Sequence, residues 1–208
     1  MKLVVLGATG GVGLEVIRQA VEHDHSVTAF VRQSQGLALF SDRITVVRGD
    51  LLNSDALTHV IEGQDAVVSG FGPRLPLSNG DSHLLQEFSV ALTNAMLRAA
   101  VNRLIVVSTA FLFKDSILPP TNLVGRLFFP QIVNDAAQME KVISCSGLEW
   151  TVVRPPRLTN RPLTATYRVR EGHLPSFGFT ISRADVANYL LKAAEMRSAV
   201  GRVVGIAN

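Results

Sequence analysis

The sequence predicts a doubly wound α/β fold, in which one parallel sheet carries helices on both faces. Short, continuously apolar segments alternate along the chain with segments of helical periodicity, as buried parallel strands and their crossover helices require. A glycine-rich loop joins the first apolar segment to the first helical one. The length of 208 residues, 47% of them hydrophobic and 18% charged, suits a single domain over residues 1–208 with a large core.

The first half of the chain supplies five strands and two helices. Apolar and β-branched residues predict strands at 2–6, 27–31, 44–47, 66–68 and 104–107. The first helix begins in the glycine loop and repeats Leu14, Ile17 and Val21 on one face. A second, longer helix starts near Leu85 and leads into the fifth of these strands.

The second half continues the same alternation. Apolar residues from Ile132 to Ile143 predict a helix, and residues 150–153 predict the next strand. The segment Ser182 to Asp185 fits a capping box and starts a helix that runs to about residue 195, before a last strand at 202–206. We expect substrate-pocket elements at about residues 110–130 and 154–182.

Composition and spacing exclude several classes of protein. The longest apolar run, residues 104–113, is shorter than the ~20 residues that a membrane-spanning helix needs, and the N-terminus lacks a signal-peptide pattern. We therefore expect a cytoplasmic protein with no membrane partner. Cys145 is the single cysteine, which excludes an intrachain disulfide; we expect it buried in a helix. His23 and His25 lie in a turn near the end of the first helix with no third ligand at metal spacing, so no metal site is expected.

The net charge of +3 is too small for a dedicated nucleic-acid-binding protein. The basic residues are unevenly distributed, however, because residues 154–170 hold five arginines and no acidic side chain. This segment either binds an anionic ligand or forms a solvated face. Arg157 is the strongest candidate for substrate binding, since Pro155 and Pro156 stiffen the chain before it.

The strongest motif is GATGGVG at residues 7–13, placed between the first strand and the first helix as a Rossmann-type dinucleotide fingerprint requires. Gly7 permits the tight turn, Gly10 lets the backbone approach a pyrophosphate, and Gly13 lets the helix pack closely on the strand. The helix N-terminus attracts the anion. The cofactor-binding candidates here are Gly7, Thr9, Gly10, Gly11, Val12 and Gly13.

The end of the second strand favours NADP(H) over NAD(H). NAD-binding proteins usually carry an acidic residue there, whereas this chain has Arg32 and no Asp or Glu from Ser26 to Ser41. Arg32 is suited to clamp a 2′-phosphate, although an exposed strand-end arginine is the alternative. Asp50 and Leu51 follow the third strand where the adenine is usually flanked; Asp50 is equally suited to a loop or capping role.

Several segments resemble a known family. The glycine loop, Val31-Arg32, Gly49-Asp50-Leu51 and residues 147–155 resemble the NmrA-like group of atypical short-chain dehydrogenase/reductases. Residues 63–67, 110–112, 155–156 and 162–164 resemble, more specifically, the biliverdin IXβ reductase or NADPH-dependent flavin reductase family. The resemblance implies direct hydride transfer from NADPH to a planar acceptor, with a flavin as substrate rather than as a bound group.

The resemblance also implies site residues. It places Ser108 and Thr109 beside the nicotinamide as the catalytic hydroxyl pair, although two strand-end hydroxyls also commonly bond nearby backbone. Phe111 would line the acceptor pocket. Phe71, Gly72 and Arg74 would lie along the cofactor. Two departures stand out: Thr109 and Arg157 replace the family's serine and histidine, which favours a different or bulkier anionic acceptor and removes acid catalysis by that histidine.

The tyrosine-lysine pair of alcohol-oxidising short-chain dehydrogenases is missing. Tyr167 and Tyr189 are the two tyrosines, and Glu171 and Ala193 stand where the lysine would be. We therefore expect an NADPH-dependent reductase of a flavin, a biliverdin-like tetrapyrrole or a quinone, acceptors that can take a proton from water. The alternative is a non-enzymatic NADP(H) sensor of the NmrA-like type. The oligomeric state, monomer or homodimer, stays open.

Overall fold

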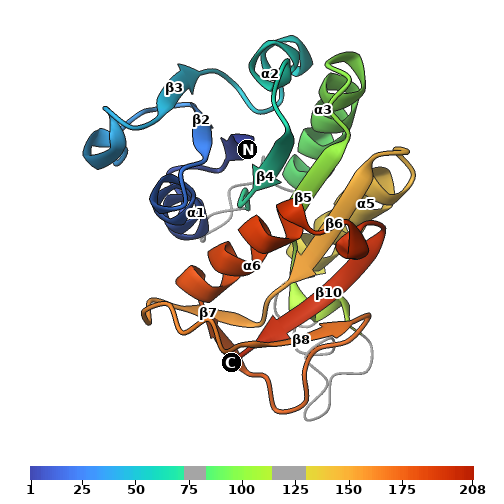
Figure 1. Cartoon of the computed structure of the whole chain (residues 1–208). Coiled ribbons are helices and arrows are strands. Elements are labelled where there is room, and N and C mark those ends of the chain that lie inside the picture. Colours follow the sequence, from blue (N-terminus) through green and yellow to red (C-terminus); the bar gives the residue numbers. More distant parts are fainter. Residues whose placement is uncertain (73–82, 114–129) are drawn as a thin grey trace.

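The computed structural model describes residues 1–72, 83–113 and 130–208. Its main sheet has eight strands in the order β3-β2-β1-β4-β5-β6-β10-β8, and all neighbours pair in parallel except β8, which runs antiparallel to β10 (Figure 1). The reversal of strand order between β1 and β4 is that of a Rossmann fold. The doubly wound parallel sheet predicted from the sequence is confirmed.

The strands of the main sheet are β1 (Lys2–Leu6), β2 (Ser26–Val31), β3 (Thr45–Arg48), β4 (Ala66–Ser69), β5 (Arg103–Val107), β6 (Glu149–Arg154), β8 (Arg168–Glu171) and β10 (Arg202–Ala207). A separate two-stranded parallel sheet consists of β7 (Arg157–Thr159) and β9 (Thr180–Ser182). The described ranges also contain the short 3-10 helices η1 (Ala38–Phe40), η2 (Ala110–Leu112) and η3 (Arg197–Ala199).

Helices cover both faces of the main sheet (Figure 1). Those on one face are α1 (Gly11–Glu22) and α6 (Arg183–Glu195); those on the other are α2 (Ser54–Ile61), α3 (Leu84–Arg98) and α5 (Pro130–Ser144). Alternation along β1 links the two layers, because Leu3 and Val5 pack beneath α1 and α6 whereas Val4 and Leu6 pack beneath α2 and α3. The strand β1 therefore contributes to both hydrophobic cores, one on each face of the sheet.

The sequence missed some elements and misplaced one residue. The helix α2 has eight residues, too few for a clear periodicity, although Asn53 caps it by accepting from two backbone N–H groups. The edge strand β8 was missed because all four of its residues are exposed. The prediction of a buried Cys145 is wrong: it follows the last residue of α5 and is exposed, two positions beyond the buried Ile143.

Candidate cofactor and active site

Most of the predicted site residues lie at the carboxyl edge of the main sheet. The glycine loop follows β1, Arg32 follows β2, and Phe71 and Gly72 come shortly after β4. Ser108 and Thr109 follow β5 directly. Since the strands are parallel, their carboxyl ends meet at one edge, and open α/β sheets bind ligands there. The fold thus brings together residues that are about 100 positions apart in the sequence.

The glycine loop packs so closely that side chains are excluded. Gly7 has a φ of +69°, and a Cβ added to it would lie 2.6 Å from the backbone nitrogen of Phe71. A Cβ on Gly13 would lie 2.2 Å from the carbonyl oxygen of Gly7. Gly10 is less confined, with 3.1 Å to the same oxygen. The loop therefore forms a bare backbone cradle of the kind that a dinucleotide pyrophosphate requires.

The N-terminus of α1 is free to bind an anion. The N–H of Leu14 makes the first intrahelical bond, to the carbonyl of Gly10 at 2.9 Å. The N–H groups of Gly11, Val12 and Gly13 have no acceptor within the part of the chain that the structure describes, so they are left for an external one. Gly10 supplies no side-chain cap, and the first turn contains no acidic residue. Thr9, half-buried, precedes this turn. These features fit the pyrophosphate of a nicotinamide dinucleotide.

A second arginine accompanies Arg32 at the ends of β2 and β3. Val31 and Arg48 are partners in the strand register, so Arg48 lies beside the position where Arg32 leaves the sheet. Arg48 donates to the hydroxyl of Ser34 at 2.9 Å, and both arginines are exposed. The sequence analysis missed Arg48. It could have been found as the arginine that ends β3, the strand next to β2. Two cations at the ends of neighbouring strands are suited to a 2′-phosphate.

The remaining predicted cofactor residues differ in their surroundings. The carboxylate of Asp50 accepts from the N–H of Leu52 at 3.1 Å, so it serves its own loop, and Leu51 is buried in the core beneath α2 and α3. The ring of Phe71 packs on Phe88 with 4.8 Å between centroids, and Gly72 is exposed. Arg74 lies outside the described residues.

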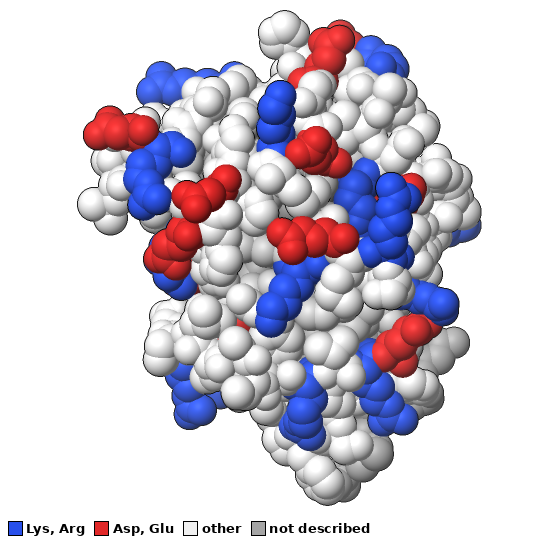
Figure 2. Space-filling model, in the orientation of Figure 1, with Lys and Arg blue, Asp and Glu red and all other residues white. Residues whose placement is uncertain are grey.

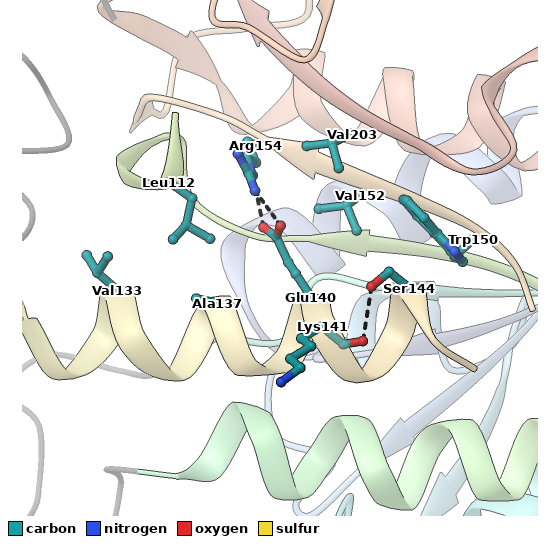
Figure 3. A pocket seen from close by; sticks show the side chains of 10 residues that line it. All are labelled: Leu112, Val133, Ala137, Glu140, Lys141, Ser144, Trp150, Val152, Arg154 and Val203. Carbon is teal, nitrogen blue, oxygen red and sulfur yellow. Dashed lines mark hydrogen bonds and ion pairs between the residues drawn. The ribbon is translucent and has the colours of Figure 1, made fainter. Parts of the chain in front are cut away.

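Ser108 belongs to a partly buried polar network. Its hydroxyl donates to the Oε1 of Glu140 on α5 at 2.5 Å. Arg154, the last residue of β6, donates to both oxygens of the same carboxylate, at 2.9 and 2.5 Å (Figure 3). Arg154 also stacks on the ring of Phe113 at 4.7 Å. With its hydrogen committed to Glu140, the oxygen of Ser108 is left to accept. The sequence analysis missed Glu140. Its position four residues after the buried Ala136 puts both residues on the same face of α5, which could have indicated that Glu140 points inward.

Thr109 and Phe111 lie together at the start of η2. The Oγ1 of Thr109 caps this short helix by accepting from the N–H of Phe111 at 3.3 Å. Within the described ranges, the hydroxyl hydrogen of Thr109 has no acceptor, so it is available to donate to a ligand. Phe111 itself is half-buried. Thr109 thus differs from Ser108, whose hydrogen is already used.

A pocket of about 420 Å³ opens between α5 and strands β6 and β10 (Figure 3). The Glu140–Arg154 pair forms its polar wall, and apolar and aromatic side chains form most of the rest; the other lining residues are Leu112, Val133, Ala137, Lys141, Ser144, Trp150, Val152 and Val203. Phe111 and Arg157, the predicted substrate residues, are not among them. Glu140 connects this pocket to Ser108.

The five arginines of residues 154–170 do not act as one cluster. Arg154 is paired with Glu140, and Arg168 donates to the backbone carbonyls of Ser176 and Asn208. Arg157 begins β7 and is exposed. Acidic and basic side chains are interspersed over most of the face shown in Figure 2. Arg157 is thus the predicted substrate residue that remains accessible in this segment.

The two tyrosines are unsuited to proton exchange near neutral pH. Burial raises the pKa of Tyr189, and burial together with the negative charge of Asp185 raises that of Tyr167. Tyr167 donates its hydroxyl hydrogen to Asn188 at 2.9 Å. An alcohol dehydrogenase of the short-chain type needs the opposite shift, a lowered phenol pKa. The geometry therefore agrees with the loss of the tyrosine-lysine pair in the sequence.

A doubly wound sheet with a bare glycine cradle at its carboxyl edge defines a dinucleotide-binding protein of the Rossmann type. The chain belongs to the NAD(P)H-binding family, whose model matches residues 7–197. The prediction of an atypical short-chain dehydrogenase/reductase is thereby confirmed. No helix within residues 1–72, 83–113 and 130–208 is long and apolar enough to cross a membrane.

Individual relatives agree with this membership. An uncharacterised chloroplast protein of Arabidopsis thaliana is 30% identical over 214 residues, which cover 99% of this chain and 76% of the relative. A short-chain dehydrogenase/reductase of Veillonella parvula, solved in complex with NADP, has a TM-score of 0.84 at 20% identity and covers 100% of this chain and 94% of its own. ChuY, an anaerobilin reductase of Escherichia coli O157:H7, has a TM-score of 0.81 at 18% identity, with 100% and 97% covered. The two structures share the fold of this chain.

Proposed function

We propose that this protein is an NADPH-dependent reductase that transfers a hydride directly to a flat, conjugated acceptor: a flavin, a biliverdin-like tetrapyrrole or a quinone. The observation that carries the proposal is the meeting of three features at one sheet edge. These are the glycine cradle, the arginines Arg32 and Arg48, and the hydroxyl pair Ser108 and Thr109. When bound, NADPH supplies the hydride, and the acceptor takes its proton from water.

The two hydroxyls have complementary roles in this proposal. Ser108 accepts a hydrogen bond from the carboxamide N–H of the nicotinamide, because Glu140 already holds its hydrogen. Thr109 donates its free hydrogen to the acceptor and polarises it. Phe111 and Arg157 contact the acceptor, the first through its ring and the second through its charge. The protein thereby aligns two rings for transfer, and none of its side chains has to gain or lose a proton.

The preference for NADPH rests on charge at the ends of β2 and β3. Arg32 and Arg48 offer two guanidinium groups to a 2′-phosphate, and no acidic residue lies between Ser26 and Ser41 to repel it. NADH lacks that phosphate and gains nothing from either arginine. Arg32→Ala should accordingly weaken NADPH binding and leave NADH binding little changed.

The deciding experiment follows NADPH consumption by absorbance with FMN, biliverdin and a small quinone as separate acceptors. NADH is run in parallel, with Arg32→Ala as the test variant and Arg98→Ala, an exposed arginine at the end of α3, as the matched control. Turnover that prefers NADPH and falls in Arg32→Ala alone supports the reductase and ranks the acceptors. Tight NADP(H) binding with no turnover on any acceptor overturns it in favour of the sensor.

A further inference from the structure

The side chain of Arg183 crosses the N-terminus of α1. Arg183 is the first residue of α6, and α6 packs beside α1 on the same face of the sheet. A Cβ added to Gly11 would lie 2.6 Å from Cδ and 2.7 Å from Nε of Arg183. Gly11 therefore leaves the space that this arginine occupies, and a guanidinium lies next to the helix end that the cofactor pyrophosphate approaches.

The helix α1 differs from α2, α3 and α6 in how the N–H groups of its first turn are satisfied. Asn53 caps α2, Ser182 caps α6, and the carboxylate of Asp135 accepts from the N–H groups of Leu85 and Gln86 at the start of α3. The first turn of α1 has neither a side-chain cap nor an acidic residue. Uncapped N–H groups therefore lie beside an arginine that bonds to no carboxylate among residues 1–72, 83–113 and 130–208, and both carry positive charge.

Arg183 is held in place by a neutral partner. Its Nη1 donates to the side-chain oxygen of Asn160 at 2.6 Å. Asn160 directly follows β7, and Arg183 directly follows β9, so the two-stranded sheet fixes both ends of the contact. A neutral amide orients the guanidinium without neutralising it, which leaves its charge for an anion.

We propose that Arg183 is a cofactor-positioning residue that binds the pyrophosphate of NADP(H) over Gly11, with Asn160 holding it ready. The inference rests on the cofactor part of the proposed function. Because the pyrophosphate is common to both nicotinamide dinucleotides, Arg183 contributes equally to NADP(H) and NAD(H), whereas Arg32 and Arg48 serve NADP(H) alone. Arg183 also links the cofactor to the segment that carries Arg157, through the strands β7 and β9.

Calorimetric titration of the full chain with NADP⁺, NAD⁺ and 2′-AMP separates these roles. Arg183→Ala should weaken NADP⁺ and NAD⁺ by the same factor, about 10-fold, as expected for loss of a charge-assisted hydrogen bond. Binding of 2′-AMP, which lacks the pyrophosphate, should not change. Arg32→Ala should show the opposite pattern, weakening NADP⁺ and 2′-AMP and sparing NAD⁺. Arg197→Ala is the matched control, an exposed arginine beyond the other end of α6.

A combined variant tests the role of Asn160. Asn160→Ala should weaken NADP⁺ less than Arg183→Ala does, and it should have no further effect once Arg183 is replaced. Thermal unfolding without ligand establishes that each variant is folded, and Arg183→Gln replaces Arg183→Ala if the latter is not. Unchanged affinity for NADP⁺ in a folded Arg183 variant overturns the inference. Since these titrations need no turnover, failure of the reductase proposal leaves their result intact.

Discussion

The hydroxyl of Ser108 and the carboxylate of Glu140 are joined by a hydrogen bond of 2.5 Å, although the two residues are 32 positions apart. Arg154, at the end of β6, donates hydrogen bonds to both oxygens of the same carboxylate. Three elements, β5, α5 and β6, therefore meet at one ion pair beside the hydroxyl pair of the proposed active site. Because its hydrogen is donated to Glu140, Ser108 can only accept a further hydrogen bond. Its position depends on the ion pair between Glu140 and Arg154.

Removing Glu140 should cost much more stability than removing a surface carboxylate. In Glu140→Ala the guanidinium of Arg154, which is largely buried, loses its ion-pair partner. We therefore expect the free energy of unfolding to fall by about 3 kcal/mol. Urea denaturation measures it. Glu171→Ala is the control, because Glu171 pairs with Arg202 in solvent, and its loss should stay below about 1 kcal/mol. Equal losses in the two variants would show that the Glu140 network is not structurally important.

Arg48 should contribute to the preference for NADP(H) independently of Arg32. Arg48→Ala removes one of two cations at the ends of β2 and β3, and we expect NADPH affinity to fall about 10-fold with NADH affinity unchanged. Fluorescence titration of each reduced cofactor is the measurement. Arg202→Ala, at the distant start of β10, provides the control. An equal effect on both cofactors would place Arg48 away from the 2′-phosphate.

Two neighbouring glycines should respond differently to alanine. The space at Gly13 is closed by the backbone oxygen of Gly7, so Gly13→Ala should lower the free energy of unfolding by about 3 kcal/mol. The space at Gly11 is closed only by the flexible Arg183 side chain. In an Arg183→Ala background Gly11→Ala should therefore become neutral or stabilise by about 0.5 kcal/mol, since alanine favours helix. Chemical denaturation of the single and double variants tests this, and a Gly11→Ala that stays destabilising in that background would contradict it.

Asp185 should make stability depend on pH in the acidic range. Its burial favours the neutral acid, but hydrogen bonds from Asn208, Thr164 and Ser182 outweigh this and lower its pKa below the ordinary value. A lowered folded-state pKa stabilises the fold above the unfolded pKa, about 3.9, and the contribution is lost as pH falls through the folded value.

The wild type should exceed Asp185→Asn in free energy of unfolding by about 2 kcal/mol near pH 7. The difference should stay constant above about pH 5 and shrink below about pH 4. Urea denaturation across this pH range measures both curves, and Glu171→Gln, an exposed carboxylate, should run parallel to the wild type. Parallel curves for Asp185→Asn would show that the carboxyl titrates alike in the folded and unfolded chains.

Much of the fold was predictable because its signals are local. Continuous apolar strands, the glycine loop and the cap at Ser182 each occupy a few adjacent residues, and each predicted element is present. The strand β8 was not predictable, since its four residues are exposed and its pairing with β10 depends on residues more than 30 positions away.

The sequence by itself determined the class of fold, the family and the glycine cradle, because short-range patterning of apolar residues and glycines specifies strand, turn and helix. Only the tertiary structure decided which charged side chains meet. Glu140 reaches Ser108, Arg48 lies beside Arg32, and Arg183 crosses Gly11, 172 positions earlier in the chain. No local pattern encodes these contacts. They arise because parallel strands bring their carboxyl ends, and the helices that start there, to one edge of the sheet.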